Sequence, residues 1–297
     1  MRLGAYQFPG GGNLERNFAH VLGGIKRAAE ENVRFLAFHE CALTGYPPLE
    51  TTVDSIDFEA ASRCLEEVRA LSVRHGMYIA LGTAERRGKN IYNTVRVFAP
   101  DAEPYVPYDK RALWGWDREN FYPGGGGGLF EADGVRIGVR ICFEVRFPEY
   151  FRELYQAGAG LCVVSFCDLS REDDRERYCL IRAHLQTRAV ENVMPILAVN
   201  SCARYQTAPT AFFDRSGRVT AELERGREDL LIYDFIHQEE NFGTRGTEND
   251  KRASPGRPLI SRDAVPDRGP PCEGKRRSLR LLLPRPRAAT GHKTLRF

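Results

Sequence analysis

Short apolar strands alternate with amphipathic helices along most of the chain, and the strands outnumber the helices. The pattern predicts strands over 34–38, 77–85, 94–100, 135–141, 161–166, 195–200 and 230–235, a hairpin over 210–224, and helices over 14–25, 59–74, 148–157 and 175–192. Many strands are flanked by a helix on only one side. Two sheets packed face to face, with helices outside, would bury all of these elements, so we expect an α/β fold.

The charge distribution separates the body of the chain from its end. The net charge of the 297 residues is +3, but residues 237–297 hold 14 of the 43 Lys and Arg against 7 of the 40 Asp and Glu, a balance of +7. This region also carries 7 of the 17 prolines and shows no sustained helical or strand period. We therefore predict a single domain over 1–245 and a basic, irregular, poorly ordered tail over 246–297.

The tail allows two interpretations. Its composition resembles GC-rich DNA translated in a shifted reading frame, which sequencing the gene across codon 246 would test. The alternative is a genuine basic arm for an acidic partner. The mildly acidic body gives no indication of nucleic-acid binding.

Cysteine usage and hydropathy indicate the compartment. The eight cysteines form no CxxC pair, and no Cys or His pair has the spacing of a zinc site. No apolar run approaches the roughly 18–20 residues of a membrane helix. The sequence opens directly on a plausible strand rather than a leader. We expect a cytoplasmic protein with reduced thiols, no metal, no cofactor and no membrane partner.

A reactive position is predicted where the strand over 135–141 gives way to a helix. Cys142 follows the strand, Pro148 suits a first helical turn, and Gly158 suits the stop. Backbone amides at such a turn are unpaired, so a side chain there can react beside ready-made oxyanion donors. A small buried core residue is the competing interpretation of Cys142.

A thiol nucleophile needs a base and a cation, and three further residues offer them. Glu40 follows a buried strand in "FLAFHECALTGYPP", at the sheet edge where α/β proteins commonly build their sites. Lys110 follows in "YVPYDKRALWGW", and Glu119 precedes an aromatic-Tyr-Pro-Gly turn. Each residue alone is a weak signal.

Together these motifs closely resemble the carbon–nitrogen hydrolase (nitrilase) superfamily. Its strand-ending Glu is matched by Glu40 in "ECALTGYPP", and its Tyr-x-Lys by Lys110 in "YDK". Its second Glu is matched by Glu119 in "ENFYPGG", and its nucleophile motif by Cys142 in "ICFEVRFPE". The resemblance covers about residues 1–245, and the four-part set is far more specific than any one member.

The resemblance implies a four-layer αββα sandwich and cleavage of a non-peptide C–N bond through a thioester. Glu40 is expected to take the thiol proton and later to activate water. Lys110, with the backbone N–H of Phe143, is expected to stabilise the thiolate and the oxyanion. Glu119 is expected to hold Lys110 in place and to orient the substrate amide. Glu144 is interpreted either as structural or as a residue that supports the groups in contact with substrate.

The expected substrate is a small-molecule amide or N-carbamoyl compound. Family members that act on nitriles tend to carry Trp after the cysteine, whereas this chain has Phe143, so the resemblance favours the amidase and carbamoylase branch. Tyr46, Trp114 and Trp116 lie in the flanking loops and are candidate pocket walls, with a structural role as the alternative. The resemblance also implies a homodimer or larger homo-oligomer.

Other functions remain open at this point. An amine-directed acyltransferase would use the same thioester, and a nitrilase the same fold. A glutaminase domain is disfavoured because no second domain with a nucleotide loop is present, and a papain-like enzyme because the six histidines sit in no recognisable motif. An inactive binding or scaffold protein of the same fold is the alternative from outside enzymology.

Overall fold

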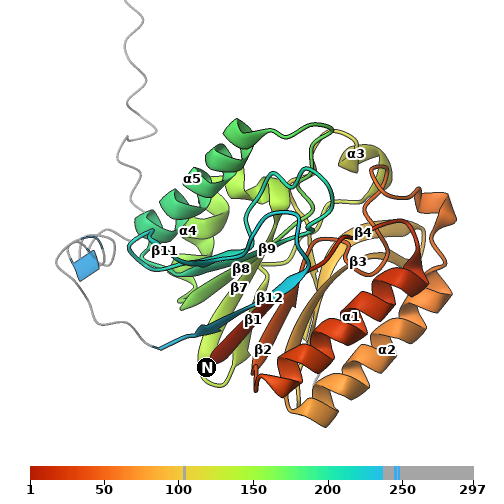
Figure 1. Cartoon of the computed structure of the whole chain (residues 1–297), viewed down its shortest axis with the longest axis horizontal. Helices are drawn as coiled ribbons and strands as arrows, with labels where there is room; N and C mark the ends of the chain where they lie inside the picture. Colours follow the sequence, from red (N-terminus) through yellow and green to blue (C-terminus); the bar gives the residue numbers. More distant parts are fainter. Residues whose placement is uncertain (103–104, 237–243, 246, 248–297) are drawn as a thin grey trace, which may run out of the picture. The chain divides into compact units, whose positions relative to one another are not determined.

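The computed structural model describes residues 1–102, 105–236, 244–245 and 247. The predicted tail over 246–297, and with it the question of its order, lies outside these residues except for Thr247. Two six-stranded sheets form the body, in the strand orders β12-β1-β2-β3-β4-β5 and β11-β10-β9-β8-β7-β6. Figure 1 shows the first strand, β1, beside both β2 and β12.

The elements of the first sheet and its helices come mainly from the first half of the chain. They are β1 (Arg2–Gln7), α1 (Leu14–Glu30), β2 (Phe35–Phe38), α2 (Phe58–His75), β3 (Tyr78–Arg87), β4 (Asn90–Phe98), β5 (Tyr108–Asp109) and, near the end, β12 (Asp229–Asp234). A short 3₁₀ turn spans Val53–Ser55, and a four-residue helix, α3, spans Asp117–Asn120.

The second sheet follows in the chain. It comprises β6 (Leu129–Ala132), β7 (Val135–Ile141), β8 (Leu161–Phe166), β9 (Ile196–Asn200), β10 (Ala211–Phe213) and β11 (Val219–Glu222), with α4 (Pro148–Gln156) and α5 (Arg175–Asn192) between strands. The predicted helices agree with α1, α2, α4 and α5 to within a few residues. The short strands β5 and β6 have no counterpart among the predicted elements, because two to four residues show too little periodicity.

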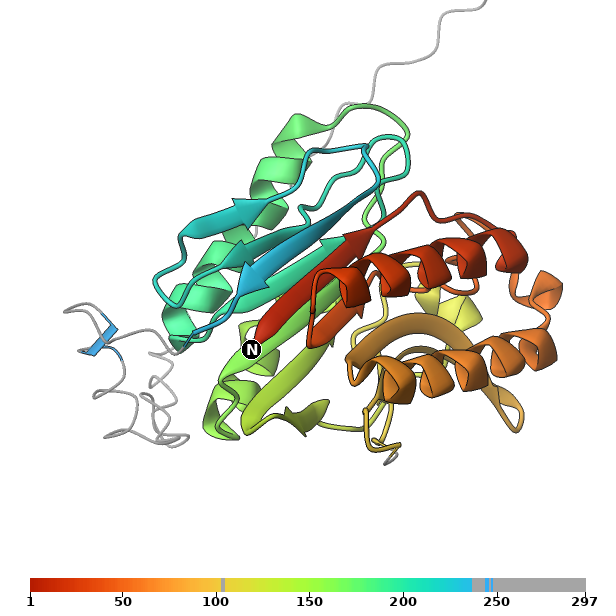
Figure 2. The ribbon, with the colours of Figure 1, turned by 60° about the horizontal axis from the view of Figure 1, so that its bottom comes forward.

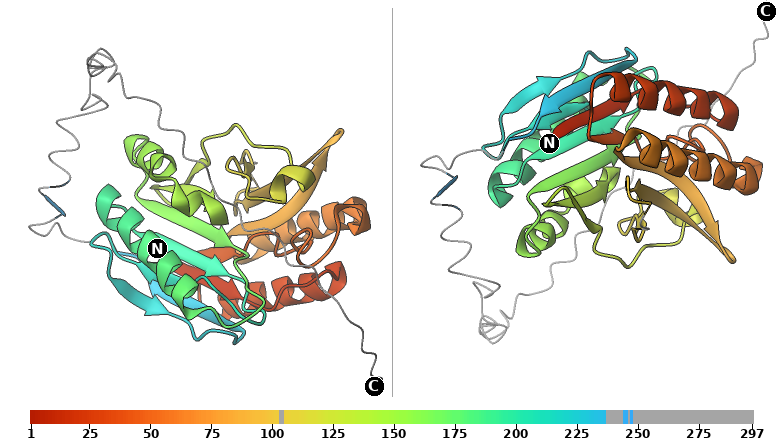
Figure 3. Two further views of the ribbon diagram at one scale, coloured as in Figure 1. Left: turned by 90° about the horizontal axis from the view of Figure 1, so that it is seen from above. Right: turned by 90° about the horizontal axis from the view of Figure 1, so that it is seen from below.

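The central strands β2, β8 and β9 bury both of their faces, which is consistent with four layers. In β8, Leu161 and Val163 face the other sheet, whereas Cys162 and Val164 pack against α4 and α5. In the first sheet the outer face packs against α1 and α2. Figures 2 and 3 show the two helix pairs on opposite outer sides of the paired sheets. The αββα sandwich expected from the sequence is therefore confirmed.

Strand direction places several chain segments at one edge of this sandwich. β1, β2 and β3 are parallel to one another, as are β7, β8 and β9. The carboxyl ends of β2 and β8 meet across the two sheets, where Ser165 Oγ donates to Phe38 O at 3.0 Å and Glu40 N donates to Phe166 O at 3.2 Å. Residues that follow these two strands are thus brought together from opposite sheets.

Candidate active site

Cys142 begins a short 3₁₀ turn, Cys142–Arg146, directly after β7. Its φ of 46° lies in the left-handed region, which side chains other than glycine rarely adopt and which is common at functional sites. The first N–H groups of a helical turn have no partner within it, so the amide of Phe143 belongs to an end that can bind a developing negative charge. The predicted strand–turn–helix around Cys142 is confirmed.

Glu40 lies two residues after β2 and is buried, with 1% of its surface exposed. Its Oε1 accepts hydrogen bonds from Lys110 Nζ and Asn93 Nδ2, both at 2.7 Å, and its Oε2 accepts one from Cys167 N at 2.9 Å. Burial raises the pKa of Glu40, an effect that Lys110 and Asn93 oppose. The carboxylate is held by donors from both sheets.

Lys110 follows β5 and is equally buried. Its Nζ lies between Glu40 Oε1 and Asp117 Oδ2, at 2.7 Å from each. Burial alone would lower the pKa of Lys110, but the carboxylates of Glu40 and Asp117 oppose this effect, and the pKa lies well above its ordinary value. A permanent ammonium therefore stands at the centre of the site.

The acidic partner of Lys110, besides Glu40, is Asp117 and not Glu119, which corrects the sequence-based expectation. Asp117 is fully buried, and its Oδ1 also accepts a hydrogen bond from the hydroxyl of Tyr46 at 2.6 Å. Glu119 is exposed. Asp117 opens α3, and successive helical residues turn by about 100°, so a residue two positions later faces a nearly opposite direction. Asp117 precedes Glu119 by two residues, and the phase of the short helix determines which of the two acids faces Lys110.

The thiol of Cys142 is surrounded by groups that keep it protonated. Burial and the carboxylate of Glu40 raise the pKa of the Cys142 thiol well above its ordinary value, and Lys110 opposes them only in part. A thiol in this state needs a base to remove its proton during attack.

Glu144 joins the 3₁₀ turn that begins at Cys142 to the loop that follows Lys110. Its Oε2 accepts a hydrogen bond from Ile141 N at 2.7 Å, and its Oε1 accepts one from Arg111 N at 2.7 Å. The Tyr108 hydroxyl lies 2.9 and 2.8 Å from the two carboxylate oxygens. Glu144 is fully buried, in agreement with the structural role expected for it.

A cavity of about 180 Å³ opens over the thiol. Its walls include Cys142, Lys110 and all four predicted pocket residues, Tyr46, Trp114, Trp116 and Phe143. The rings of Trp114 and Trp116 meet edge to face, with their centroids 4.4 Å apart. The polar part of the wall also includes Arg146, the ion pair between Arg177 and Asp168, and the side chains of Ser170 and Asp174.

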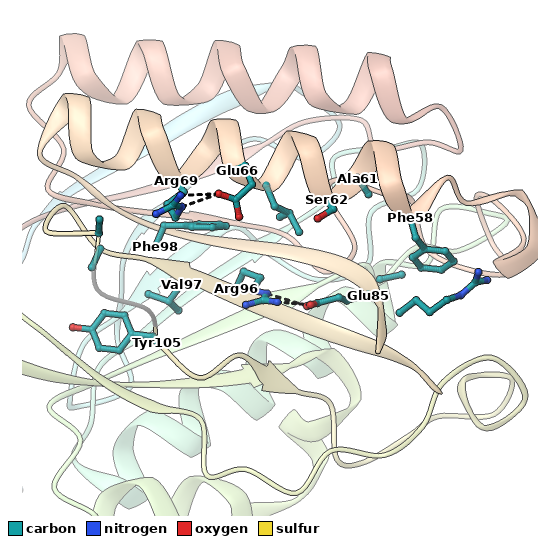
Figure 4. Close-up of a pocket in the computed structure, with 15 residues that line it drawn as sticks. Phe58, Ala61, Ser62, Glu66, Arg69, Glu85, Arg96, Val97, Phe98 and Tyr105 are labelled. Carbon is teal, nitrogen blue, oxygen red and sulfur yellow. Dashed lines mark hydrogen bonds and ion pairs between the residues drawn. The ribbon is translucent and has the colours of Figure 1, made fainter. Parts of the chain in front are cut away.

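A second, larger cavity of about 490 Å³ lies between α2 and β4 (Figure 4). Its two acidic residues are both paired: Glu66 accepts from Arg69 Nε at 2.9 Å, and Glu85 accepts from Arg96 Nε at 2.9 Å. No cysteine, histidine or lysine lines it. Of these two cavities, the one over Cys142 contains a cysteine and a lysine.

Neither a metal cluster nor a membrane helix is found in the part of the chain that the structure describes. Within that part, no group of three or more His, Cys, Asp or Glu side chains has the arrangement to hold a metal ion. No helix among the described residues is long and apolar enough to cross a membrane.

The chain is similar in sequence to proteins of known family. A family model described as Carbon-nitrogen hydrolase matches residues 2–239. The 2-oxoglutaramate amidase of Bacillus subtilis is 28% identical over 217 residues, which cover 71% of this chain and 80% of that protein. The glutamine-dependent NAD(+) synthetase of Xylella fastidiosa is 24% identical over 251 residues, which cover 81% of this chain but 45% of the synthetase.

Solved structures show the same fold. The NitN amidase of Nesterenkonia sp. AN1 superposes with a TM-score of 0.71 at 21% sequence identity, covering 85% of this chain and 97% of that one.

Proposed function

Since the chain belongs to the carbon–nitrogen hydrolase family, in the amidase branch of the nitrilase superfamily, we propose that it hydrolyses a small-molecule amide or N-carbamoyl compound through a thioester on Cys142 and releases ammonia. The observation that carries this proposal is the convergence on one cavity of a protonated thiol and a buried ammonium, with a carboxylate 2.7 Å from that ammonium. Nucleophile, electrophilic stabiliser and base are the three groups that acyl transfer needs.

In the acylation step, the Sγ of Cys142 attacks the carbonyl carbon while Glu40 takes the thiol proton. Lys110 and the N–H of Phe143 stabilise the oxyanion, and such a donor is worth about 3–4 kcal/mol in the transition state. Glu40 returns the proton to the leaving nitrogen, the C–N bond breaks, and ammonia departs from the thioester. Asp117 takes the part first expected of Glu119, since it holds Lys110 in place.

In the deacylation step, Glu40 removes a proton from water, whose oxygen attacks the thioester carbonyl. Collapse of the second tetrahedral intermediate expels the Cys142 sulfur, which recovers the proton from Glu40. The products are a carboxylic acid, or a carbamic acid that decomposes to carbon dioxide and a second amine or ammonia. The same two groups therefore serve both half-reactions.

The test combines intact-protein mass spectrometry with ammonia release, over a panel of primary amides, N-carbamoyl compounds and nitriles. Cys142→Ala removes the nucleophile, and Cys179→Ala, at an exposed position of α5, is the matched control. We expect ammonia and an acyl adduct with the wild type and with C179A, and neither with C142A. Ammonia release by C142A at the wild-type rate would overturn the proposal, as would the absence of turnover across the panel.

Three outcomes would identify the alternatives. Acyl transfer to an added amine in preference to water would indicate an acyltransferase. Turnover confined to nitriles would indicate a nitrilase, against the preference given by Phe143. A stable fold with no adduct and no turnover would favour a binding or scaffold protein.

Within this class we favour an amide that also carries a carboxylate. Arg146 and Arg177 both line the cavity, and the guanidinium of Arg177 is held by Asp168 at 2.7 Å. The Bacillus subtilis relative acts on 2-oxoglutaramate, an amide of this type. Comparison of 2-oxoglutaramate with a neutral amide of equal length tests the preference, and Arg146→Met should reduce it by raising KM for the anionic substrate only.

We further propose a cytoplasmic location and a homodimer or larger homo-oligomer. The seven cysteines of the described residues are all free, which is typical of reducing compartments. Leu180 and Val190 of α5 expose 51% and 44% of their surface, and apolar residues of this kind favour a helix-to-helix contact between copies. Light scattering coupled to gel filtration measures the assembly, and a monomer at micromolar concentration would refute it.

A further inference from the structure

Asn93 makes contact with both of the charged groups that the proposed reaction depends on. It lies in β4 opposite Ala84 of β3 and is buried, with 1% of its surface exposed. Its backbone oxygen accepts a hydrogen bond from Lys110 N at 2.8 Å, and its side-chain Nδ2 donates to Glu40 Oε1 at 2.7 Å. Asn93 thus contacts the main chain of Lys110 and the side chain of Glu40.

These contacts close a ring. Lys110 Nζ donates to the same oxygen, Glu40 Oε1, at 2.7 Å. The path runs from Asn93 through the Lys110 backbone and side chain to Glu40, and back to Asn93 through its own amide. Because both ends of the path begin on one strand residue, the separation between the Lys110 ammonium and the Glu40 carboxylate is set locally, by β4.

The two oxygens of Glu40 are left in different environments. Oε1 accepts from two side chains, one of them charged, whereas Oε2 accepts from a backbone amide, that of Cys167, at 2.9 Å. Cys167 lines the same cavity as Cys142. Oε2 is therefore the less neutralised oxygen, and the residue that donates to it lies in the wall of the cavity that also contains the thiol.

The amide of Asn93 is not explained by stability alone. Its Oδ1 is buried and has no hydrogen-bond partner among the described residues. A buried polar atom without a partner costs free energy, which an apolar side chain of the same shape would avoid. The hydrogen bond that the amide does make is the one from Nδ2 to Glu40 Oε1.

We propose that Asn93 is a positioning residue that fixes Glu40 with Oε1 on Lys110 and leaves Oε2 as the proton acceptor. This inference rests on the proposed function and deepens it. Oε2 takes the proton of the Cys142 thiol as the bond from sulfur to carbon forms. It then delivers that proton to the leaving nitrogen as the C–N bond breaks, and it acts in the same way on water in the second half-reaction.

The test uses two substitutions at Asn93 and one matched control. Asn93→Leu removes the donor at nearly constant shape, and Asn93→Asp keeps the shape but sets a carboxylate against Glu40. Thr94→Val is the control, because Thr94 is the next residue of β4, is fully buried and donates one hydrogen bond to Tyr108 O at 3.0 Å. Each variant removes one buried hydrogen bond made by β4, but only Asn93 reaches Glu40.

The first readout requires no substrate. Iodoacetamide alkylation of Cys142, followed on its peptide by mass spectrometry across pH, reports how readily Glu40 removes the thiol proton. We expect N93L to slow alkylation at neutral pH by about tenfold, as the loss of a hydrogen bond to a charged group implies, and T94V to stay near the wild type. The N93D profile should move further toward alkaline pH because a like charge disfavours ionised Glu40.

The second readout is amide turnover across pH. For N93L we expect kcat to fall by about 100-fold, within the range of general base catalysis, with KM nearly unchanged. The acid limb of kcat/KM should shift to higher pH, since loss of the donor raises the pKa of Glu40. Melting temperatures of N93L and T94V should fall by similar amounts, which separates the catalytic effect from a loss of stability.

The outcomes distinguish this inference from the proposed function. If the wild type turns over amides and N93L matches T94V in both pH profiles, the inference is overturned and the function stands. If the wild type turns over no amide but Cys142 alkylation still separates N93L from T94V, the inference holds and the function fails.

Discussion

Gly82 of β3 lies directly against the backbone of Glu40: a Cβ at Gly82 would stand 2.9 Å from the Cα of Glu40 and overlap the carbonyl oxygen of His39. Gly82→Ala should therefore displace the base. We expect kcat/KM to fall by about 100-fold, because a misplacement of about 1 Å in a catalytic group has this effect. Steady-state kinetics measures it, with circular dichroism as a check on folding.

Gly23→Ala in α1 is the control for that substitution, since a Cβ there meets nothing within 4 Å. It should leave activity unchanged and stabilise the helix by roughly 0.5–1 kcal/mol. Wild-type kinetics in G82A would show that the backbone of Glu40 can move without consequence.

The neighbouring acids of α3 should respond differently to neutralisation. Asp117→Asn removes one of the two carboxylates around Lys110, so kcat/KM should fall by about 10- to 100-fold, as loss of a charge-assisted hydrogen bond implies. The pKa of Lys110 should also fall, which moves the alkaline limb of the profile of kcat/KM against pH to lower pH. Glu119→Gln, at an exposed position, should be indistinguishable from the wild type. The reverse ranking would restore Glu119 to the site.

Glu144→Gln should reduce stability and activity together. The substitution keeps the shape but replaces a carboxylate that accepts from Ile141 N and Arg111 N by an amide, so at least one buried donor loses its partner. We expect about 1–3 kcal/mol of destabilisation, measured by urea unfolding. Because these contacts tie the nucleophile turn to the Lys110 loop, kcat should fall as well. A destabilised variant with unchanged kcat would limit Glu144 to a purely structural part.

His39, which precedes Glu40 in the chain, should make folding sensitive to acid. Burial lowers its pKa to about 4, and its Nδ1 lies 3.0 Å from Glu40 O. A lowered folded-state pKa means that the unfolded chain takes up the proton first, so this contribution to stability is full above about pH 6.5 and is lost as pH falls toward 4. Between pH 7.5 and 5 the expected loss is about 2 kcal/mol.

The pH dependence contributed by Glu50 has the opposite sign. Burial raises the pKa of Glu50 to about 7, so the folded protein takes up this proton first and gains stability as pH falls toward the pKa of Glu50 in the unfolded chain. The prediction therefore concerns the difference between the wild type and His39→Gln in urea unfolding at the two pH values. Exposed His75 supplies the control, His75→Gln, which should track the wild type. Equal pH dependence in the wild type and H39Q would contradict the assignment.

The sequence was sufficient for the sandwich and for part of the site. The family resemblance predicted Glu40 and Lys110 as members of one site, and their side chains lie 2.7 Å apart although 70 residues separate them in the chain. It failed between Asp117 and Glu119, because a loop motif gives the spacing of two acids but not the phase of the short helix that carries them. Because α3 begins at Asp117, this acid faces Lys110 and Glu119 points away from it.

Asn93 could not be found from the sequence for a different reason. It stands inside a strand with no motif around it, and its contact with Glu40 joins residues 53 apart across β4 and the end of β2. Strand register determines which residue of β4 reaches the carboxylate, and a single chain does not reveal the register. The catalytic roles of all these residues stay predictions until the variants are measured.

Glu40 and Lys110 follow strands of one sheet, and Cys142 follows a strand of the other. The proposed catalytic centre therefore depends on how the two sheets are packed against each other. A slip of one sheet against the other by a fraction of a side chain would separate nucleophile from base while every helix and strand stayed intact. The rate of turnover should therefore depend on the relative position of the two sheets. Mild denaturant should abolish amide turnover at concentrations at which circular dichroism detects no loss of secondary structure.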